Sequence, residues 1–268
     1  MSKLLRSALS GSDWKQNELK AYNILVQTED AQTFFNRELL SIDHLDPNLL
    51  STEETNITDN FAPPTAKFLA YLDRALRSYP GEESEIDDLV RSLLNITGYD
   101  EAGTTLRTRC NIKLAICGET NRSAKTDVCL EHVSSMILLL VHEDKTISGT
   151  DPEPQVIAEA IASFQENNAK REDSGQDVLD AMTVPCVTMV GTQAGPVFYK
   201  VPVTMELSEC VRAGTYPKNA TVVTRCAPPK HQPLAGMEDP DNRRIILQYY
   251  TTFREVAKQC WSQFIANM

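Results

Sequence analysis

Residues 125–145 read KTDVCLEHVSSMILLLVHEDK and contain two extended segments separated by a short turn. In the first segment, Thr126, Val128 and Leu130 alternate with more polar neighbours, which is the period of a half-buried strand. Residues 136–141 are apolar on both faces, which is typical of a strand that is covered on both sides. Two short strands with so short a connection most simply pair in an antiparallel manner.

The same pattern extends outward on both sides of this stretch. Residues 112–116 alternate as a further strand, and we expect a turn over 118–123 before the next one. An apolar helical stripe follows Glu82 and ends near Gly98, and a second begins at Asp151 and ends in a polar exit over 167–176. The predicted order is therefore a helix, a three-stranded meander, a helix and a strand. This last strand covers residues 184–190, and a further strand is expected over 197–203.

The remaining segments are predicted mainly as helices, apart from a short strand within residues 21–28. Thr28 or Asp30 is suited to cap a short helix that follows this strand. Residues 41–64 are polar and acidic and predict a loop, and Pro80-Gly81 stops the helix that begins at Thr65. We divide the chain into a helical N-terminal extension (1–80), an α/β core (81–230) and a C-terminal helix (231–268).

Composition places the chain among ordinary globular proteins, with 268 residues, 41% hydrophobic and 24% charged. The longest apolar run, residues 136–141, is far shorter than the roughly 20 residues that span a membrane. The first residues also lack the apolar core of a signal peptide. We therefore expect no membrane partner and an intracellular location, in the nucleus or cytoplasm. The seven cysteines are expected to be reduced and to act as small hydrophobes.

Three charged residues in the opening stretch indicate a chemistry. Glu143 and Lys145 are two residues apart and share one face of their strand, and Asp127 on the neighbouring strand can meet Glu143 across the ladder. Paired carboxylates form a hard-oxygen site for Mg²⁺ or Mn²⁺. Such a metal activates water and polarises a phosphoryl oxygen, while the lysine stabilises the charge of the transition state. The alternative is a surface hairpin with ordinary salt bridges.

Two helical residues fit the same site. Glu83 lies on the apolar face of its helix, where a carboxylate needs a partner such as a cation, although it is equally suited to the helix dipole. Gln155 lies one turn before Glu159 and can reach a water or a phosphate, but it can also be an ordinary first-turn residue. Glu159 is expected to pair with a local basic residue.

The net charge of −11 does not suggest a protein that binds polyanions over its whole surface. A local basic excess exists around the first two strands, opposed in that stretch only by Glu119. Its members are Arg107, Arg109, Lys113, Arg122 and Lys125. A cleft can be locally basic and hold nucleic acid, whereas such a run is more often a solvated face.

Other enzyme chemistries have little support. The four histidines, at 44, 132, 142 and 231, are scattered, and His142 is expected to face away from Glu143. The sequence contains no Gly-x-Ser-x-Gly nucleophile elbow and no Gly-x-x-x-x-Gly-Lys phosphate loop.

With Asp127 followed by Glu143-Asp144-Lys145 on this element order, the chain resembles the PD-(D/E)XK nuclease superfamily, whose core is that of restriction endonucleases. Further stretches resemble fungal nuclease-like proteins of this superfamily. They are residues 17–35, Glu82-Glu83-Ser84 with Leu94, 116–119, 125–129, 138–145, 151–164 and 241–244. One departure is Lys125-Thr126, which replaces the proline before the motif aspartate.

The resemblance implies an α/β restriction-endonuclease-like core with helical additions at both ends. It implies that Asp127 and Glu143 bind Mg²⁺ or Mn²⁺, that Lys145 assists catalysis, that Glu83 is the first-helix acid and that Gln155 is the glutamine after the lysine. The expected function is metal-dependent phosphodiester hydrolysis of nucleic acid, DNA rather than RNA. Members of this superfamily also include inactive proteins, so the alternative is a catalytically silent scaffold that acts as a binding or effector protein.

Overall fold

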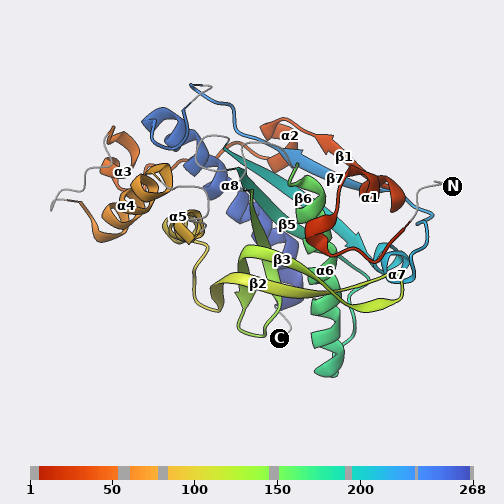
Figure 1. Cartoon of the computed structure of the whole chain (residues 1–268). Coiled ribbons are helices and arrows are strands. Elements are labelled where there is room, and N and C mark those ends of the chain that lie inside the picture. The colour runs from red at the N-terminus through yellow and green to blue at the C-terminus, as the bar shows by residue number, and fades with distance from the viewer. Residues whose placement is uncertain are drawn as a thin grey trace.

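The computed structural model describes residues 6–53, 61–77, 84–144, 151–190, 195–232 and 235–265, with only the backbone of residues 84, 143 and 144. They form an α/β fold around one seven-stranded mixed sheet in the order β1-β7-β6-β5-β4-β3-β2 (Figure 1). The strands are β1 (Ile24–Thr28), β2 (Thr104–Ile116), β3 (Glu119–His132), β4 (Ile137–Asp144), β5 (Ala181–Val190), β6 (Pro196–Thr204) and β7 (Thr221–Cys226).

Helices cover both faces of the sheet. They are η1 (Gly11–Asp13), α1 (Gln16–Ala21), α2 (Ala31–Phe35), α3 (Pro47–Ser51), α4 (Pro63–Arg77), α5 (Ser84–Ile96), α6 (Glu153–Asp173), α7 (Met205–Ala213) and α8 (Pro240–Ile265). On β4, His142 contacts Glu159 of α6. In the adjacent strand β5, His142 pairs with Thr188, and the next residue, Met189, accepts a hydrogen bond from Tyr250 of α8. Because neighbouring strand residues point to opposite faces, α6 and α8 lie on opposite sides of the sheet (Figure 1).

The three-stranded meander is confirmed. β2 pairs with β3 and β3 with β4, both antiparallel, with Val128 opposite Val141. The β2–β3 turn is tighter than expected, because residues 119–123 already belong to β3. Cys117 and Gly118 have φ values of 51° and 82°, and two consecutive positive φ angles suit a two-residue hairpin turn whose twist matches the strands.

The strand β2 is kinked at Arg109, whose φ is 55°. The ladder pairs on either side are Thr108 with Val128 and Cys110 with Thr126, so Arg109 lies opposite Asp127. A left-handed residue inside a strand re-aims the side chains around it, as β-bulges do near functional sites. The kink therefore lies beside the carboxylate that the sequence singles out.

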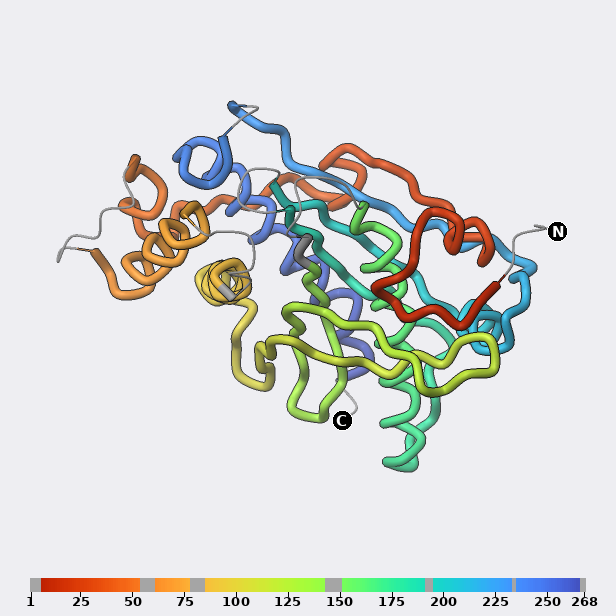
Figure 2. The backbone as a smooth tube through the Cα atoms, viewed as in Figure 1, coloured from red at the N-terminus to blue at the C-terminus, as the bar shows by residue number. Residues whose placement is uncertain are grey.

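The segment before residue 80 contributes directly to the sheet, since β1 pairs in parallel with β7. Figure 2 shows this N-terminal strand alongside the C-terminal part of the chain. Asp30, rather than Thr28, caps α2, because its side chain accepts from the Thr33 amide at 2.9 Å. Within the expected loop over 41–64, the structure has the short helix α3. Asp46 caps it, and proline occupies its first turn.

The helix α6 is longer than the apolar stripe predicts, since it runs through the polar residues 167–173. Asn167 and Asn168 continue the helix while buried, because their amides bond the backbone of Ile137 and Leu179. The helix α7 and the strand β7 are also absent from the sequence-based expectation. The stop at Pro80-Gly81 and the start at Glu82 lie outside the described residues.

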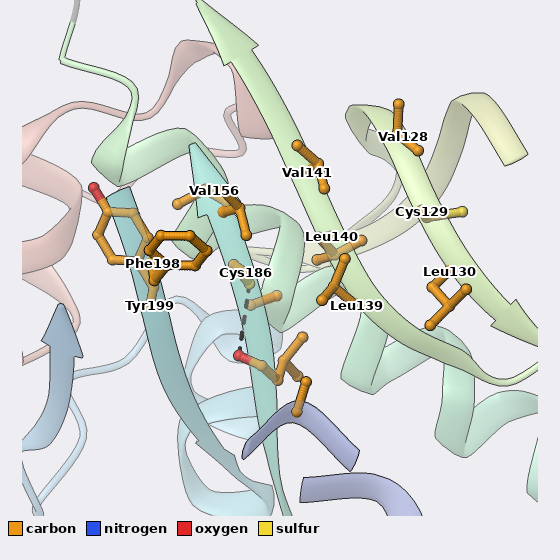
Figure 3. Packing of buried hydrophobic residues seen from close by; sticks show 14 of the residues in the cluster. Val128, Cys129, Leu130, Leu139, Leu140, Val141, Val156, Cys186, Phe198 and Tyr199 are labelled. Atoms are coloured by element: carbon orange, nitrogen blue, oxygen red, sulfur yellow. Dashed lines mark hydrogen bonds between the residues drawn. The ribbon is translucent and has the colours of Figure 1, made fainter. Parts of the chain in front are cut away.

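One hydrophobic core occupies both faces of the sheet. Figure 3 shows Val128 on β3, Val141 on β4, Val156 of α6 and Phe198 on β6 among the packed side chains, and all four are fully buried. On the α8 face, Phe198 packs against Phe253 with ring centroids 4.9 Å apart. Within the described residues, no helix is long and apolar enough to cross a membrane.

Candidate functional site

Asp127 lies on β3, one residue beyond the pair that Val128 forms with Val141 of β4. Its side chain keeps 23% of its surface exposed, and its Oδ2 is 3.8 Å from Nδ1 of His142. That separation is longer than a hydrogen bond, so the contact is electrostatic. The carboxylate therefore lies at the protein surface, next to the last residues of β4.

His142 connects this carboxylate to a buried one. Its Nδ1 is 2.7 Å from Oε1 of Glu159, whose side chain is 2% exposed. Burial raises the pKa of Glu159, while the charge and hydrogen bond of His142 oppose that rise. Asp127 raises the pKa of Glu159 further by like-charge repulsion. The basic partner expected for Glu159 is thus His142, which joins β4 to α6.

A second buried carboxylate lies on the other side of the kink. Asp87, in the first turn of α5, is 4% exposed, and its Oδ2 is 3.4 Å from Nε of Arg109. Arg109 in turn lies opposite Asp127 in the ladder between β2 and β3. The first helix of the core therefore delivers a buried acidic group to Arg109, four residues after the predicted Glu83 in the sequence.

The other residues of the predicted metal site lie mainly outside the described part of the chain. Glu83 and Lys145 are not described. The backbone of Glu143 pairs with Met189 on β5, while its side chain is not described. The register places Asp127 opposite His142, so Glu143 is not its directly opposed partner in the ladder as expected, but lies one residue further along β4. A shared metal at Asp127 and Glu143, and the roles of Glu83 and Lys145, stay predictions.

Gln155 lies in the first turn of α6, one turn before Glu159. Its Nε2 donates a hydrogen bond of 2.9 Å to the carbonyl of Ser12, at η1. This bond ties the start of α6 to the N-terminal segment and directs the amide nitrogen to η1. The role of Gln155 toward a phosphate or water stays a prediction.

The predicted basic residues divide into two groups. Arg107 and Arg109 are engaged by acidic partners: Arg107 binds Glu131 at 2.8 Å, and Arg109 contacts Asp87. Lys113, Arg122 and Lys125 are exposed near the β2–β3 turn. In the ladder, Lys113 pairs with Ser123 and Lys125 with Asn111, which puts the two lysines two rungs apart on the same face of the hairpin.

Sequence reasoning missed two residues of this neighbourhood. The predicted site does not include Asp87, which belongs to a run of acidic residues in this part of the sequence. His142 is one of four histidines scattered along the sequence, and no motif links it to the site. A ladder register with Val128 opposite Val141 identifies it as the cross-strand neighbour of Asp127.

A further group of possible metal ligands lies away from the sheet. His231, Asp239 and Asp241 have ligand atoms within 4.8 Å of one another. Asp239, however, accepts a hydrogen bond from the amide of Asn242 at 2.8 Å and so caps the start of α8. A helix N-terminus favours anions rather than cations, which gives these aspartates a structural role without a metal.

The chemistry available around β3 and β4 is that of clustered carboxylates. Asp127 is partly exposed, and His142 lies between it and the buried Glu159, while the buried Asp87 contacts Arg109. Oxygen donors of this kind suit a hard divalent cation. A scan against protein-family models and a search of curated proteins found no match to this chain.

Proposed function

We propose that the protein is a metal-dependent nuclease, which hydrolyses phosphodiester bonds of nucleic acid, DNA in preference to RNA, at a PD-(D/E)XK-type site. The observation that carries the proposal is the position of Asp127. It lies partly exposed on β3, where β4 ends with the backbone of Glu143 and Asp144. The superfamily motif uses an aspartate on this strand together with an acidic residue from the end of the next one, and Asp127 with Glu143 supports the proposal in that sense.

The arrangement of elements supports the same proposal. The order α5, β2, β3, β4, α6, β5 contains an antiparallel meander followed by a helical crossover. After that crossover β5 pairs in parallel with β4. A restriction-endonuclease-like core has this order, and β1, β7 and the outer helices are then additions to it.

The donor set fits Mg²⁺ or Mn²⁺. Asp127 offers carboxylate oxygens on a side chain that keeps 23% of its surface exposed. Asp127 and Glu143 would hold the ion, with Glu83 as a third donor. When bound, the ion lowers the pKa of its water and polarises the phosphoryl oxygen.

The chain's own side chains then have separate tasks. Lys145 places an ammonium beside the scissile phosphate and stabilises the negative charge that develops there. Lys113, Arg122 and Lys125 hold flanking phosphates, since they are exposed near the β2–β3 turn. His142 and Glu159 fix the strand and helix behind Asp127.

A second candidate function is a catalytically silent protein that binds a partner through the same scaffold. It is favoured by the pairing of Arg107 with Glu131 and of Arg109 with Asp87, which neutralises part of the predicted basic surface. The net charge of −11 points the same way, because binding to a polyanion generally gains from positive charge.

The two functions are separated by a cleavage assay. Labelled single- and double-stranded DNA and RNA are incubated in Mg²⁺ and Mn²⁺ with wild type, Lys145→Ala and the control Lys20→Ala, which alters an exposed lysine of α1. We expect Lys145→Ala to lose about 10²–10³-fold in turnover and the control to keep wild-type activity. No wild-type cleavage of any substrate, despite bound metal, would favour the silent protein. Equal cleavage by all three would remove Lys145 from the mechanism.

A further inference from the structure

Two cysteines on adjacent strands are in direct contact. Sγ of Cys110 on β2 is 2.7 Å from Sγ of Cys129 on β3, and both are free thiols. A disulfide bond is about 2.05 Å long, so the sulfurs need to approach by only about 0.7 Å to be joined. Figure 3 shows the sulfur of Cys129 directed away from β4.

The kink at Arg109 accounts for this contact. The ladder places Cys110 opposite Thr126 and Cys129 opposite Arg107, so the two cysteines are not a directly opposed pair. The left-handed φ of 55° at Arg109 re-aims the chain between these positions. The two sulfurs are thus in contact in the present register of β2 and β3.

Charged groups from two elements surround the pair. Arg107 of β2 and Lys170 of α6 both bind Glu131, at 2.8 Å and 3.4 Å. The contact with Cys129 lowers the pKa of Cys110, as do the charges of Arg107 and Lys170, whereas burial and Glu131 oppose that change. Cys110 is thus the thiol suited to act first, as thiolates are the reactive form.

Exposure ranks the two cysteines in the same order. Cys110 is 6% exposed and Cys129 is 1% exposed, so a small oxidant reaches Cys110 first. We propose that Cys110 and Cys129 form a reversible disulfide when the protein meets a hydroperoxide, which fastens β2 to β3 beside Asp127. This modification is independent of the proposed nuclease activity.

The reaction takes place in two balanced steps. The Cys110 thiolate attacks one oxygen of hydrogen peroxide, the O–O bond breaks, and a sulfenic acid and hydroxide form. The Cys129 thiolate then attacks the sulfur of that sulfenic acid, the S–O bond breaks, and the disulfide and a second hydroxide form. Overall two thiols and one hydrogen peroxide give one disulfide and two waters. Dithiothreitol reverses the bond.

The test is performed on the full-length protein in its native state. The reduced protein is treated with hydrogen peroxide, remaining thiols are alkylated in denaturant, and the digest is examined by mass spectrometry. We expect one cross-linked peptide pair, Cys110 with Cys129, which disappears after dithiothreitol. We also expect the oxidised protein to melt about 5 °C higher, because the bond restricts the unfolded chain.

Variants assign the roles of the two thiols. Cys129→Ala is expected to accumulate a dimedone-reactive sulfenic acid at Cys110, whereas Cys110→Ala is expected to leave Cys129 largely unmodified. Cys186→Ala is the matched control, because Cys186 is fully buried on β5 and its loss is expected to leave the cross-link intact. Wild type alone decides the proposal if the variants fold poorly. Absence of the Cys110–Cys129 peptide, while the half-buried Cys117 and Cys210 are oxidised, overturns it. A mixture of unrelated pairings overturns it as well.

Discussion

Nδ1 of His142 lies 2.7 Å from Oε1 of Glu159, which joins β4 to α6 immediately behind Asp127. A carboxylate as deeply buried as Glu159 is costly unless a donor or an opposite charge accompanies it. His142 supplies both when it is protonated, and it is itself 3.8 Å from Asp127. The three side chains therefore respond together to a change in any one of them.

The first prediction concerns the pH dependence of stability through Glu159. Burial raises its pKa above the ordinary value of 4.5. The folded state therefore binds a proton more tightly than the unfolded state does. The stability that this proton contributes is fully present below about pH 4.5 and is lost as the pH rises through the raised pKa.

Glu159→Gln removes this titration. We expect the free energy of unfolding of the variant, relative to wild type, to increase as the pH rises from about 4 to about 8. Urea denaturation across that range measures the difference. Glu172→Gln, at an exposed position of the same helix, is expected to show no such trend. A constant difference between Glu159→Gln and wild type would show that Glu159 titrates normally in the folded protein.

The meander could be predicted from sequence because its signal is local. Alternation around Val128 and the apolar run ending at Val141 identify β3 and β4, and both exist with antiparallel pairing. The kink at Arg109 could not be predicted, because an arginine in the left-handed region carries no compositional signature. Its position opposite Asp127 follows only from the pairing on both sides.

The elements that were missed depend on tertiary contacts. Asn167 and Asn168 break the apolar stripe of α6. The helix nevertheless continues, because their side-chain amides donate hydrogen bonds to the backbone carbonyls of Ile137 and Leu179. The candidate site shows the same limit. Asp127 was identified from its motif, whereas His142 becomes its neighbour only through the register of β3 against β4.

The second prediction concerns the attachment of α8 to the helices before the core. Arg243 is 1% exposed and donates to the carbonyl oxygens of Leu49 at 2.8 Å and Met237 at 2.9 Å, and to that of Thr52. Burial lowers the pKa of Arg243 to about 10. Arg243→Met leaves these carbonyls without a donor, so we expect a loss of about 3 kcal/mol in the free energy of unfolding.

Urea denaturation tests this loss, with Arg244→Met as the matched control. Arg244 lies next in the sequence and donates to the carbonyl of Leu50, but it is exposed. Water can replace its hydrogen bond, and we expect a cost below about 1 kcal/mol. Equal losses for the two variants would contradict the anchoring role of Arg243.

The third prediction concerns the exposed lysines of the β2–β3 hairpin. Lys113→Glu combined with Lys125→Glu is expected to weaken nucleic-acid binding by at least about tenfold and to lower the salt slope by about two, one for each lost phosphate contact. Fluorescence anisotropy in EDTA at several salt concentrations measures both. The control Lys20→Glu combined with Lys218→Glu makes the same change in net charge at exposed positions elsewhere. If both pairs weaken binding equally, the hairpin is no specific contact surface.

The last prediction concerns the metal, and it separates the two groups of possible ligands. Mn²⁺ that binds only the folded protein stabilises it, by about 2.7 kcal/mol when its concentration is one hundred times Kd. For a chain of this size we expect the melting temperature to rise by about 5–10 °C, and EDTA to reverse the rise. Asp127→Asn is expected to abolish most of the shift, because it removes an anionic oxygen from the site beside β4. Asp241→Asn is expected to retain the shift. Asp241 belongs to the group around His231, in which Asp239 already caps α8, so we expect no metal there. If the shift disappears in Asp241→Asn and persists in Asp127→Asn, the protein binds its metal at the start of α8, and the nuclease site loses its support.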